Sequence, residues 1–360
     1  MFFSKPKEFP VSVSKQFERN CKSEDFKKIQ NLFKSEKIVK WLFAGDSITH
    51  GCRHTNNYPR FSEYFDFSLR QNKSRKNDIV YNTGVSGATT QDCIKYKFDW
   101  LERFEYDVCF ICFGMNDCFK NIVSVYDFSN NIRQIVSIVR EKGAVPVLQT
   151  PQTSSRQNYF EDYKTVLKKI ADDEEILFVD INSYWQENIK VLKKFMSDSI
   201  HPNQYGHLLW AQILLKSLGL DSEMLDRVQY KSISKKIKLK KKDFSSVLKN
   251  EQVEVLLNYQ KPTRWLLAGN FDSAKTFPKR TFPQNFEEFF RFNFRQSEMT
   301  DMMRFCSYID TSVVDEKTII DNFDVYVKKF YPDIIFCDKS SFRLFENYSN
   351  ANDISVVILQ

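Results

Sequence analysis

An aspartate and a serine follow an apolar run near the start of the sequence, in the stretch KWLFAGDSITHG from Lys40 to Gly51. Ser47 therefore stands where a predicted buried strand gives way to a helix. At that junction the helix dipole and the free N–H groups favour negative charge on a serine oxygen. A serine hydroxyl is a poor nucleophile by itself, so it needs a base within hydrogen-bond reach and a group that orients the base.

Four histidines are candidates for that base: His50, His54, His201 and His207. His201 stands in the stretch SDSIHPNQYGH, and Asp198 precedes it by three positions. In a tight turn this spacing brings the carboxylate back onto the imidazole. Asp198 can then accept the Nδ1 proton, which leaves Nε2 to take the proton of Ser47. The two histidines nearest Ser47 lie too close to it in sequence to reach round, and neither has a carboxylate at such a spacing. The predicted catalytic residues are Ser47, Asp198 and His201.

Attack by a serine also requires donors for the negative oxygen of the tetrahedral intermediate. The stretches YNTGVSGATT and CFGMND both follow predicted strands, at the sheet edge where Ser47 is expected. Gly87 carries no side chain that would keep its backbone N–H away from a substrate. Asn116 offers an amide N–H in the second stretch. The backbone N–H groups of Ser47 and Gly87 and the side-chain amide of Asn116 together make a predicted oxyanion hole.

The segment after Ser47 is polar and reads HGCRHTNNYPR, from His50 to Arg60. A pocket for a long acyl chain would be lined by apolar groups. The polar loop therefore favours a small acyl group on a hydroxyl-rich alcohol such as a sugar. The predicted substrate-binding residues are Asp46, His50, Arg53 and His54.

Composition would also allow a metal ion at His50, Cys52 and His54. Nothing else in the sequence supports such a site, so we expect no metal and no cofactor. Each residue of the predicted catalytic site has a structural explanation as well: Ser47 and Asp198 could cap helices, Asn116 could cap a turn and Gly87 could serve a bend. Their joint occurrence at strand ends favours the catalytic interpretation.

The elements that must position these residues alternate between strand and helix. Five short apolar or β-branched runs predict strands: Ile38–Ala44, Asp78–Asn82, Asp107–Phe113, Ala144–Gln149 and Ile176–Asp180. Helical patterns lie between them, one precedes the first strand, and QYGHLLWAQILLKSLG predicts an amphipathic closing helix that ends at Gly219. This alternation predicts an α/β fold with a parallel sheet covered on both faces. Such folds place their sites at the carboxyl ends of the strands.

The stretches GDSITHG, TGVSGATT, GMND and DSIHPN, in this order and spacing, resemble the four sequence blocks of the SGNH hydrolases, also called GDSL esterases. The resemblance covers about residues 38–218. It implies Ser47 as nucleophile, Gly87 and Asn116 as oxyanion donors, and Asp198 with His201 as the rest of a triad. It also implies a flavodoxin-like, doubly wound five-stranded sheet, carboxylic-ester hydrolase activity and no metal.

The rest of the composition fits a soluble protein. Of the 360 residues 42% are hydrophobic, without an 18-residue apolar run or a signal-peptide pattern. The cysteines show no regular spacing, which is typical of free thiols in a reducing compartment: Cys21, Cys52, Cys93, Cys109, Cys112, Cys118, Cys306 and Cys337. Cys109 and Cys112 form a CxxC inside a predicted strand, where they would point to opposite faces rather than serve redox chemistry. We therefore expect a cytoplasmic protein without a membrane span.

The net charge is +7, and the run KSISKKIKLKKK from Lys231 to Lys242 holds seven lysines. It can be a solvated connector between domains or a patch for an anionic partner. No aromatic residue interleaves with the lysines, which argues against nucleic acid as a partner.

Past this run the chain resembles its own beginning. IQNLFKSEKIVKWLFAG, from Ile29, aligns with VEVLLNYQKPTRWLLAG, from Val253, and FSEYFDFSLRQ resembles FEEFFRFNFRQ. We expect a catalytic domain at residues 1–228, a basic linker at 229–245 and a truncated, degenerate copy at 246–360. Phe271 falls opposite Ser47, so the copy is expected to be non-catalytic. It could capture substrate or mediate formation of a homo-oligomer.

The expected function is hydrolysis of a small acyl ester, above all an acetyl ester, on a carbohydrate-like substrate through an acyl-enzyme. Three alternatives stay open from the sequence. They are a lysophospholipase or thioesterase, an acyltransferase of the same fold, and a binding protein that keeps the fold without catalysis.

Overall fold

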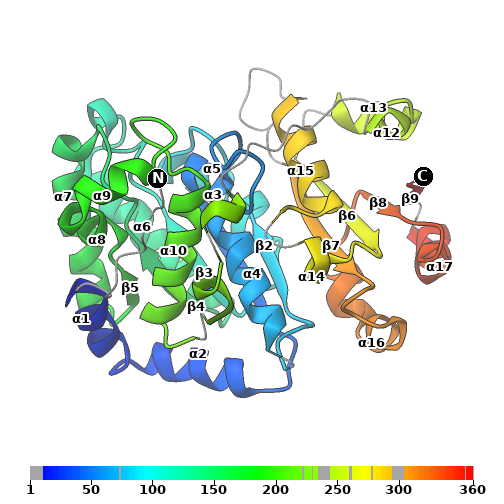
Figure 1. Cartoon of the computed structure of the whole chain (residues 1–360), viewed down its shortest axis with the longest axis horizontal. Coiled ribbons are helices and arrows are strands. Elements are labelled where there is room, and N and C mark those ends of the chain that lie inside the picture. Colours follow the sequence, from blue (N-terminus) through cyan, green and yellow to red (C-terminus); the bar gives the residue numbers. More distant parts are fainter. Residues whose placement is uncertain are drawn as a thin grey trace. The chain divides into compact units, whose positions relative to one another are not determined.

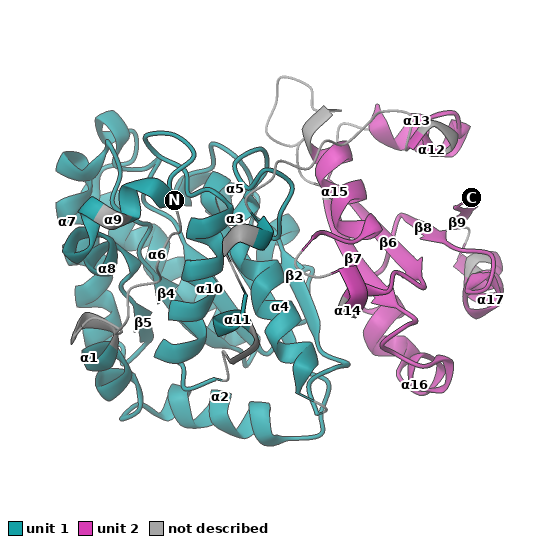
Figure 2. Cartoon of the chain, in the orientation of Figure 1, with its two compact units in different colours: residues 1–236 teal, residues 237–360 magenta. Residues whose placement is uncertain are grey.

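The computed structural model describes residues 11–72, 74–220, 223–228, 230–233, 244–258, 262–276, 279–293, 304–352 and 354–359. The chain divides into two compact units, residues 1–236 and 237–360 (Figure 2). The boundary falls within the basic run, of which residues 234–242 lie outside the described part.

Unit 1 is built on a five-stranded parallel sheet with the order β2-β1-β3-β4-β5 (Figure 1). The strands are β1 Lys40–Gly45, β2 Ile79–Asn82, β3 Val108–Cys112, β4 Val145–Gln149 and β5 Leu177–Val179. This is the strand order of flavodoxin-like doubly wound folds. The predicted fold class is therefore confirmed, and each predicted strand is present with its ends moved by no more than two residues.

The central strands are apolar throughout because both faces of the sheet are covered. All residues of β1 and β3 are buried. Phe43 and Phe110 stack across these two neighbouring strands with ring centroids 4.4 Å apart. Continuous apolar runs of this kind are the sequence pattern of strands that are buried on both sides.

Helices cover the two faces of the sheet. On one side α4 contacts α10, and α10 in turn contacts α1; on the other α5 contacts α6, and α6 contacts α7. Their bounds are α1 Val11–Asn20, α4 Phe61–Gln71, α5 Thr90–Lys95, α6 Val125–Glu141, α7 Gln157–Asp173 and α10 Gln204–Ser217. The helix predicted before the first strand is α2, Glu24–Lys34, whereas α1 was not predicted.

The closing helix α10 differs from the prediction, since it is not amphipathic. Thirteen of its residues are buried, and Lys216 is the exception. The reason is α1, which contacts α10 together with α4 and α11, Glu223–Asp226. A helix covered from several sides becomes apolar all round.

The carboxyl ends of all five strands point to one edge of the sheet, as parallel pairing requires. Ser47 follows β1, Gly87 follows β2 and Asn116 follows β3. The segment after β5 passes through α8 Ile181–Glu187, α9 Ile189–Leu192 and a 3₁₀ turn before it reaches the loop with Asp198 and His201.

Unit 2 contains a four-stranded parallel sheet with the order β7-β6-β8-β9. The strands are β6 Thr263–Gly269, β7 Arg304–Asp310, β8 Ile334–Cys337 and β9 Ser355–Ile358. Trp265 is fully buried in its core, with Phe286, Phe290 and Phe336 around it at centroid distances of 5.8, 5.1 and 5.4 Å. The second α/β unit predicted from the sequence is thus present.

The two units share details beyond strand order. In unit 1 a helix, a π-helical turn and a strand begin at Thr90, Phe98 and Val108. In unit 2 the same three elements follow one another at the same intervals, and they begin at Glu316, Asp324 and Ile334. Asp107 Oδ2 accepts the N–H of Lys40 at 2.9 Å, where β1 begins. Asp333 Oδ2 accepts the N–H of Arg264 at 2.5 Å, near the start of β6.

The paired cysteines of β3 are both buried in the sheet. Burial raises the pKa of the Cys109 and Cys112 thiols, so both stay protonated at neutral pH. A protonated, buried thiol is neither a nucleophile nor a metal ligand. Over the described residues, no helix has the length and apolar character needed to cross a bilayer.

Candidate active site

Ser47 is the first residue of the short helix α3, Ser47–His50. The residue that caps this helix is Asp46, whose Oδ1 accepts the N–H of Ile48 at 2.9 Å. The Ser47 hydroxyl is therefore not used as a cap, and its Oγ lies 3.0 Å from His201 Nε2. This distance suits proton transfer between the two groups.

Asp198 and His201 are joined in a tight loop ahead of α10. The Asp198 carboxylate lies 2.9 and 3.1 Å from His201 Nδ1 and accepts the backbone N–H groups of Ile200 and His201 at 2.7 Å each. Partial burial raises the pKa of Asp198, but these N–H groups and the imidazole outweigh it and lower the pKa to about 2. The cap of α10 is Asn203, so Asp198 is not needed in that role.

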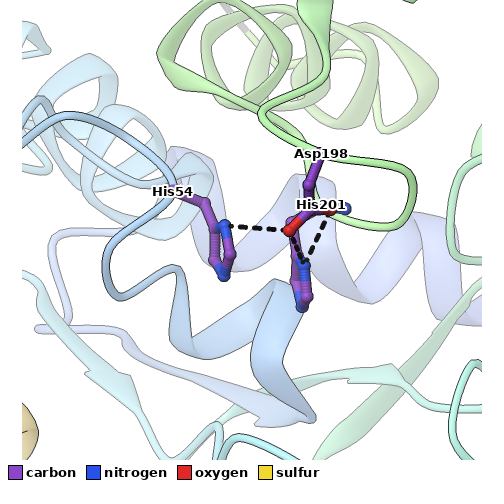
Figure 3. Close-up of side chains that lie close together, drawn as sticks. All are labelled: His54, Asp198 and His201. Atoms are coloured by element: carbon purple, nitrogen blue, oxygen red, sulfur yellow. Dashed lines mark hydrogen bonds and ion pairs between the residues drawn. The ribbon is translucent and has the colours of Figure 1, made fainter.

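His54 lies face to face with His201 (Figure 3). The ring centroids are 3.8 Å apart and the planes differ by 7°. His54 Nδ1 lies 3.6 Å from Asp198 Oδ2. Burial first, and then the neighbouring His201, lower the pKa of His54 to about 4, against the opposite effect of Asp198. His54 is therefore a neutral imidazole near pH 7.

One atom from each of His54, Asp198 and His201 lies within 4.8 Å of the other two, which raises the question of a metal site. Imidazole nitrogens bind a cation in the plane of the ring. Because these two rings are parallel and stacked, a cation in the plane of one would lie above or below the plane of the other. Rotation of His201 to correct this would break its contact with Ser47. The geometry suits hydrogen bonding better than metal coordination.

The predicted oxyanion donors come together at the same edge of the sheet. The N–H of Ser47 is at the first position of a helix, where no intrahelical acceptor exists. Gly87 has a φ of +85° with open space where a Cβ would point, so it is the backbone conformation that requires glycine here. Asn116 Nδ2 donates to the carbonyl oxygen of Ala88 at 2.9 Å, next to Gly87.

Two residues that support this arrangement were not predicted. Asp117 is fully buried, and its carboxylate accepts the N–H and hydroxyl of Thr90 at 2.8 and 2.6 Å and the N–H of Gly114 at 3.2 Å. It thereby ties the loop after β3 to the start of α5. Arg156, in the loop after β4, donates from Nη1 to Asn116 Oδ1 at 3.0 Å. A basic residue after a strand at the active edge was the available signal for Arg156.

Two of the four predicted substrate-binding residues are in the wrong place for that role. Asp46 and His50 are 1% and 2% exposed. Asp46 caps α3, and His50 lies 2.8 Å from Ser86 Oγ and 2.7 Å from Cys52 Sγ. Arg53 is exposed and His54 is half-buried beside His201, so these two remain candidates for substrate contact.

The polar composition of the loop after Ser47 has a structural cause. Thr55, Tyr58 and Arg60 are buried, and Arg60 donates to the His50 carbonyl oxygen at 3.0 Å and pairs with Glu63 at the start of α4. Three non-glycine residues of the loop, Arg53, Asn56 and Asn57, adopt left-handed φ values. The loop is a compact, internally bonded connector, so its polarity does not by itself describe a substrate pocket.

Residues 43–209 match the model of the GDSL-like Lipase/Acylhydrolase family. An acetylxylan esterase of Geobacillus stearothermophilus is 25% identical over 167 residues, which cover 39% of this chain and 73% of the relative. An isoamyl acetate-hydrolyzing esterase of Saccharomyces cerevisiae is 25% identical over 202 residues, 49% of this chain and 84% of the relative. An uncharacterized protein of Mycoplasma pneumoniae is 25% identical over 225 residues, and these span 54% of this chain and 26% of that protein.

Solved structures of similar chains include the acetylxylan esterase of Geobacillus stearothermophilus, with 24% identity, a TM-score of 0.45 and coverage of 51% of this chain and 95% of that chain. The chain spans about a quarter of the Mycoplasma pneumoniae relative, 26%, and most of the two esterases. The family match confirms the resemblance carried by the four sequence blocks. Over residues 43–209 the chain is therefore similar to the GDSL-like Lipase/Acylhydrolase family.

Proposed function

We propose that the protein is a serine esterase in which Ser47 is the nucleophile, His201 the base and Asp198 the residue that orients it. The observation that carries this proposal is the continuous contact from Ser47 Oγ to His201 Nε2 at 3.0 Å and from His201 Nδ1 to Asp198 at 2.9 Å. Asp198 is ionised at neutral pH, as its role requires. It can hold the Nδ1–H tautomer and stabilise the imidazolium that forms during reaction.

In the proposed mechanism, Ser47 Oγ attacks the acyl carbon while its proton passes to His201 Nε2. The carbonyl oxygen becomes an oxyanion, which the N–H groups of Ser47, Gly87 and Asn116 stabilise. The intermediate collapses when the alcohol leaves with the proton from His201, and Ser47 stays acylated. A water molecule then gives a proton to His201 and attacks the acyl carbon. The bond between the acyl carbon and Ser47 Oγ breaks as His201 returns the proton to that oxygen, which releases the carboxylic acid and restores Ser47.

The acyl group that we propose is acetyl. Both curated esterases among the relatives carry acetate esters in their names, acetylxylan in one and isoamyl acetate in the other. Their alcohol parts differ, a polysaccharide in one and a short alkyl alcohol in the other. We propose a carbohydrate alcohol because His54 lies beside the triad and the charge of exposed Arg53 acts on His54, and both side chains can bind hydroxyl groups.

The test is turnover of 4-nitrophenyl esters of increasing acyl length, followed by release of acetate from acetylated xylo-oligosaccharides and from isoamyl acetate. We expect kcat/KM to be highest for acetyl and to fall steeply for longer chains. A preference for long chains would favour the lysophospholipase or thioesterase alternative. Acetyl transfer to an added sugar, faster than release of acetate, would favour an acyltransferase. No turnover by a folded protein would favour a binding protein.

We further propose that residues 246–360 are a truncated, non-catalytic copy of the first unit, joined by a basic linker at 229–245. The shared strand order and the equal intervals between Thr90, Phe98 and Val108 and their counterparts support a duplication. In the copy, Asp310 accepts the N–H groups of Phe271 and Ser273, so carboxylate contacts occupy the strand end where unit 1 has its serine. Substrate capture or homo-oligomer formation is the role that we propose for it.

The cytoplasm is the compartment that we propose. The eight cysteines are thiols rather than disulfides, which suits a reducing environment.

A further inference from the structure

The guanidinium of Arg156 is held in one orientation beside Asn116. Its Nη1 donates to Asn116 Oδ1 at 3.0 Å and to the Met115 carbonyl oxygen at 2.9 Å. Its Cζ lies 4.1 Å from the centroid of the Phe119 ring. A guanidinium is planar, so a ring on one face and two acceptors at one edge fix the direction of its N–H groups.

The side-chain amide of Asn116 is consequently held at both ends. Its Oδ1 accepts from Arg156, and its Nδ2 donates to the Ala88 carbonyl oxygen at 2.9 Å. An amide nitrogen carries two hydrogens. The second one is left for another acceptor, and its direction is fixed because the amide is planar and both of its ends are engaged.

We infer that Arg156 is a positioning residue for the oxyanion donor Asn116, which it orients and polarises. The inference rests on the proposed function, since Arg156 acts here only through the donor role of Asn116. A cation that donates to Oδ1 draws electron density from the amide and makes Nδ2–H a stronger donor. It also selects the amide orientation, because a flipped Asn116 would turn Nδ2 toward the guanidinium and Oδ1 toward the carbonyl oxygen of Ala88.

The loop that carries Arg156 is also fastened to the loop of the proposed base. The N–H of Ser155 donates to the Ser199 carbonyl oxygen at 2.9 Å, and Gln152 Nε2 donates to the Ile200 carbonyl oxygen. The N–H of Arg156 itself donates to Ser154 Oγ at 3.0 Å. The short segment that ends at Arg156 therefore contacts both Asn116 and the loop that carries His201.

A double-mutant cycle tests the inference, because a residue that acts through another has a non-additive effect. Arg156→Met removes the guanidinium and keeps most of the length, and Asn116→Ala removes the donor. kcat and KM for 4-nitrophenyl acetate are measured for both single variants, the double variant and Arg156→Lys. Arg133→Met is the control, since Arg133 is also an arginine in ion pairs, with Asp173 and Glu174.

We expect Asn116→Ala to lower kcat by about 10²- to 10³-fold, as loss of an oxyanion donor does. In the otherwise wild-type protein, Arg156→Met is expected to lower kcat about 10- to 100-fold with KM nearly unchanged. In the Asn116→Ala background the same substitution should lower kcat by less than about threefold. Arg156→Lys keeps the charge without the fork and should retain part of the activity. Arg133→Met should match the wild type.

Equal losses from Arg156→Met in both backgrounds would overturn the inference, and so would a rise in KM with kcat unchanged. If Arg156→Met does not fold, by its thermal melting curve, the same cycle is run with Arg156→Lys, and additivity there has the same meaning. Wild-type activity of Ser47→Ala would instead remove the proposed function. The two failures are therefore distinguishable.

Discussion

The imidazole of His54 covers one face of the imidazole of His201, with centroids 3.8 Å apart and planes 7° from parallel. The side chain of Asp198, beside both rings, is 45% exposed. The proposed base thus depends on a stacked neighbour as well as on its carboxylate for a fixed orientation. Two kinds of substitution separate the contribution of this stack from that of the His54 nitrogen atoms.

His54→Phe should keep kcat for a small aryl acetate within about threefold of the wild type, because a flat ring still covers His201. His54→Ala should lower kcat about tenfold with little change in KM, since the base becomes less well oriented. Steady-state kinetics on 4-nitrophenyl acetate provides the comparison. Equal losses in both variants would show that the stack is not what matters. A rise in KM confined to acetylated sugars would make His54 a substrate contact.

Ser47→Ala should reduce esterase activity by at least about 10³-fold and leave the melting temperature nearly unchanged. The reason for the unchanged stability is that Asp46, and not Ser47, caps α3. Activity is followed with an aryl acetate, and unfolding by circular dichroism. Purified Ser47→Ala with wild-type turnover would refute the proposed nucleophile.

His201 and His207 should respond differently to substitution by alanine. His201→Ala is expected to lower kcat by about 10³-fold or more without loss of stability. His207 is fully buried, and its Nδ1 accepts the N–H of Phe61 at 3.2 Å. His207→Ala removes the acceptor of a buried N–H and should lower the free energy of unfolding by about 1–3 kcal/mol. Paired kinetic and urea-unfolding measurements distinguish the two; a catalytic loss in stable His207→Ala would contradict this assignment.

The free energy of unfolding should depend on the ionisation of Asp46. Burial, opposed by the N–H of Ile48 and reinforced by Asp117, raises the pKa of Asp46 from 3.8 to about 7. Between these values the unfolded chain releases the proton and the folded chain keeps it. The free energy of unfolding therefore falls as pH rises from about 4 to about 7, and this contribution levels off above that range.

Asp46→Asn removes this ionisation and keeps a residue that caps helices equally well. The free energy of unfolding of Asp46→Asn should then fall less between pH 4 and pH 7 than that of the wild type, by on the order of 4 kcal/mol. Urea unfolding at several pH values measures it. Asp78, whose pKa burial likewise raises to about 7, contributes in the same direction in both proteins and cancels in the comparison. Parallel pH profiles for wild type and variant would contradict the prediction.

The second unit is tested by truncation after Lys236. An earlier cut near residue 228 would remove Ser232 and Ile233, whose carbonyl oxygens accept from Tyr58 and from the buried side chain of Gln204. The shortened protein contains every residue of the proposed site, so turnover of aryl acetates should stay within about threefold. Activity on acetylated polysaccharide should fall if the second unit captures substrate. The proposed roles of the second unit would both be wrong if the shortened protein is fully active on both substrates and if it and the full-length chain are both monomers.

Most of the fold could be predicted because parallel α/β architecture leaves clear local signals. Buried strands are continuous apolar runs, and α4, Phe61–Gln71, is the stretch FSEYFDFSLRQ, one of the helical patterns between the strands. The helix α1 was missed since its contact surface is defined by α10 and β5, which are far away in sequence. The same tertiary contact explains why α10 is buried almost all round.

The grouping of Ser47, Asp198 and His201 could be predicted because each stands at a recognisable position beside a strand end or in a tight turn. The burial of Asp46 and His50 could not be predicted, because the sequence does not distinguish a polar loop residue that faces solvent from one in a buried hydrogen-bond network. The sequence predicts His54 as a substrate-binding residue and not as the base, and it gives no sign that the His54 ring stacks on His201. Two left-handed asparagines, Asn56 and Asn57, follow His54 in a loop whose backbone course a sequence pattern does not reveal.

The segment from Gln152 to Arg156 contacts two parts of the proposed site. At its start Gln152 donates to the carbonyl oxygen of Ile200, in the loop that carries Asp198, and at its end Arg156 donates to Asn116 Oδ1. An insertion or deletion in this segment would displace both Asp198 and the side-chain amide of Asn116. The segment should therefore tolerate almost no change in length. The loop from His50 to Arg60 is constrained in another way, because His54 stacks on His201 and buried Arg60 donates to the His50 carbonyl oxygen. Directed evolution toward new alcohols should therefore change residue types in that loop, above all at exposed Arg53, rather than its length.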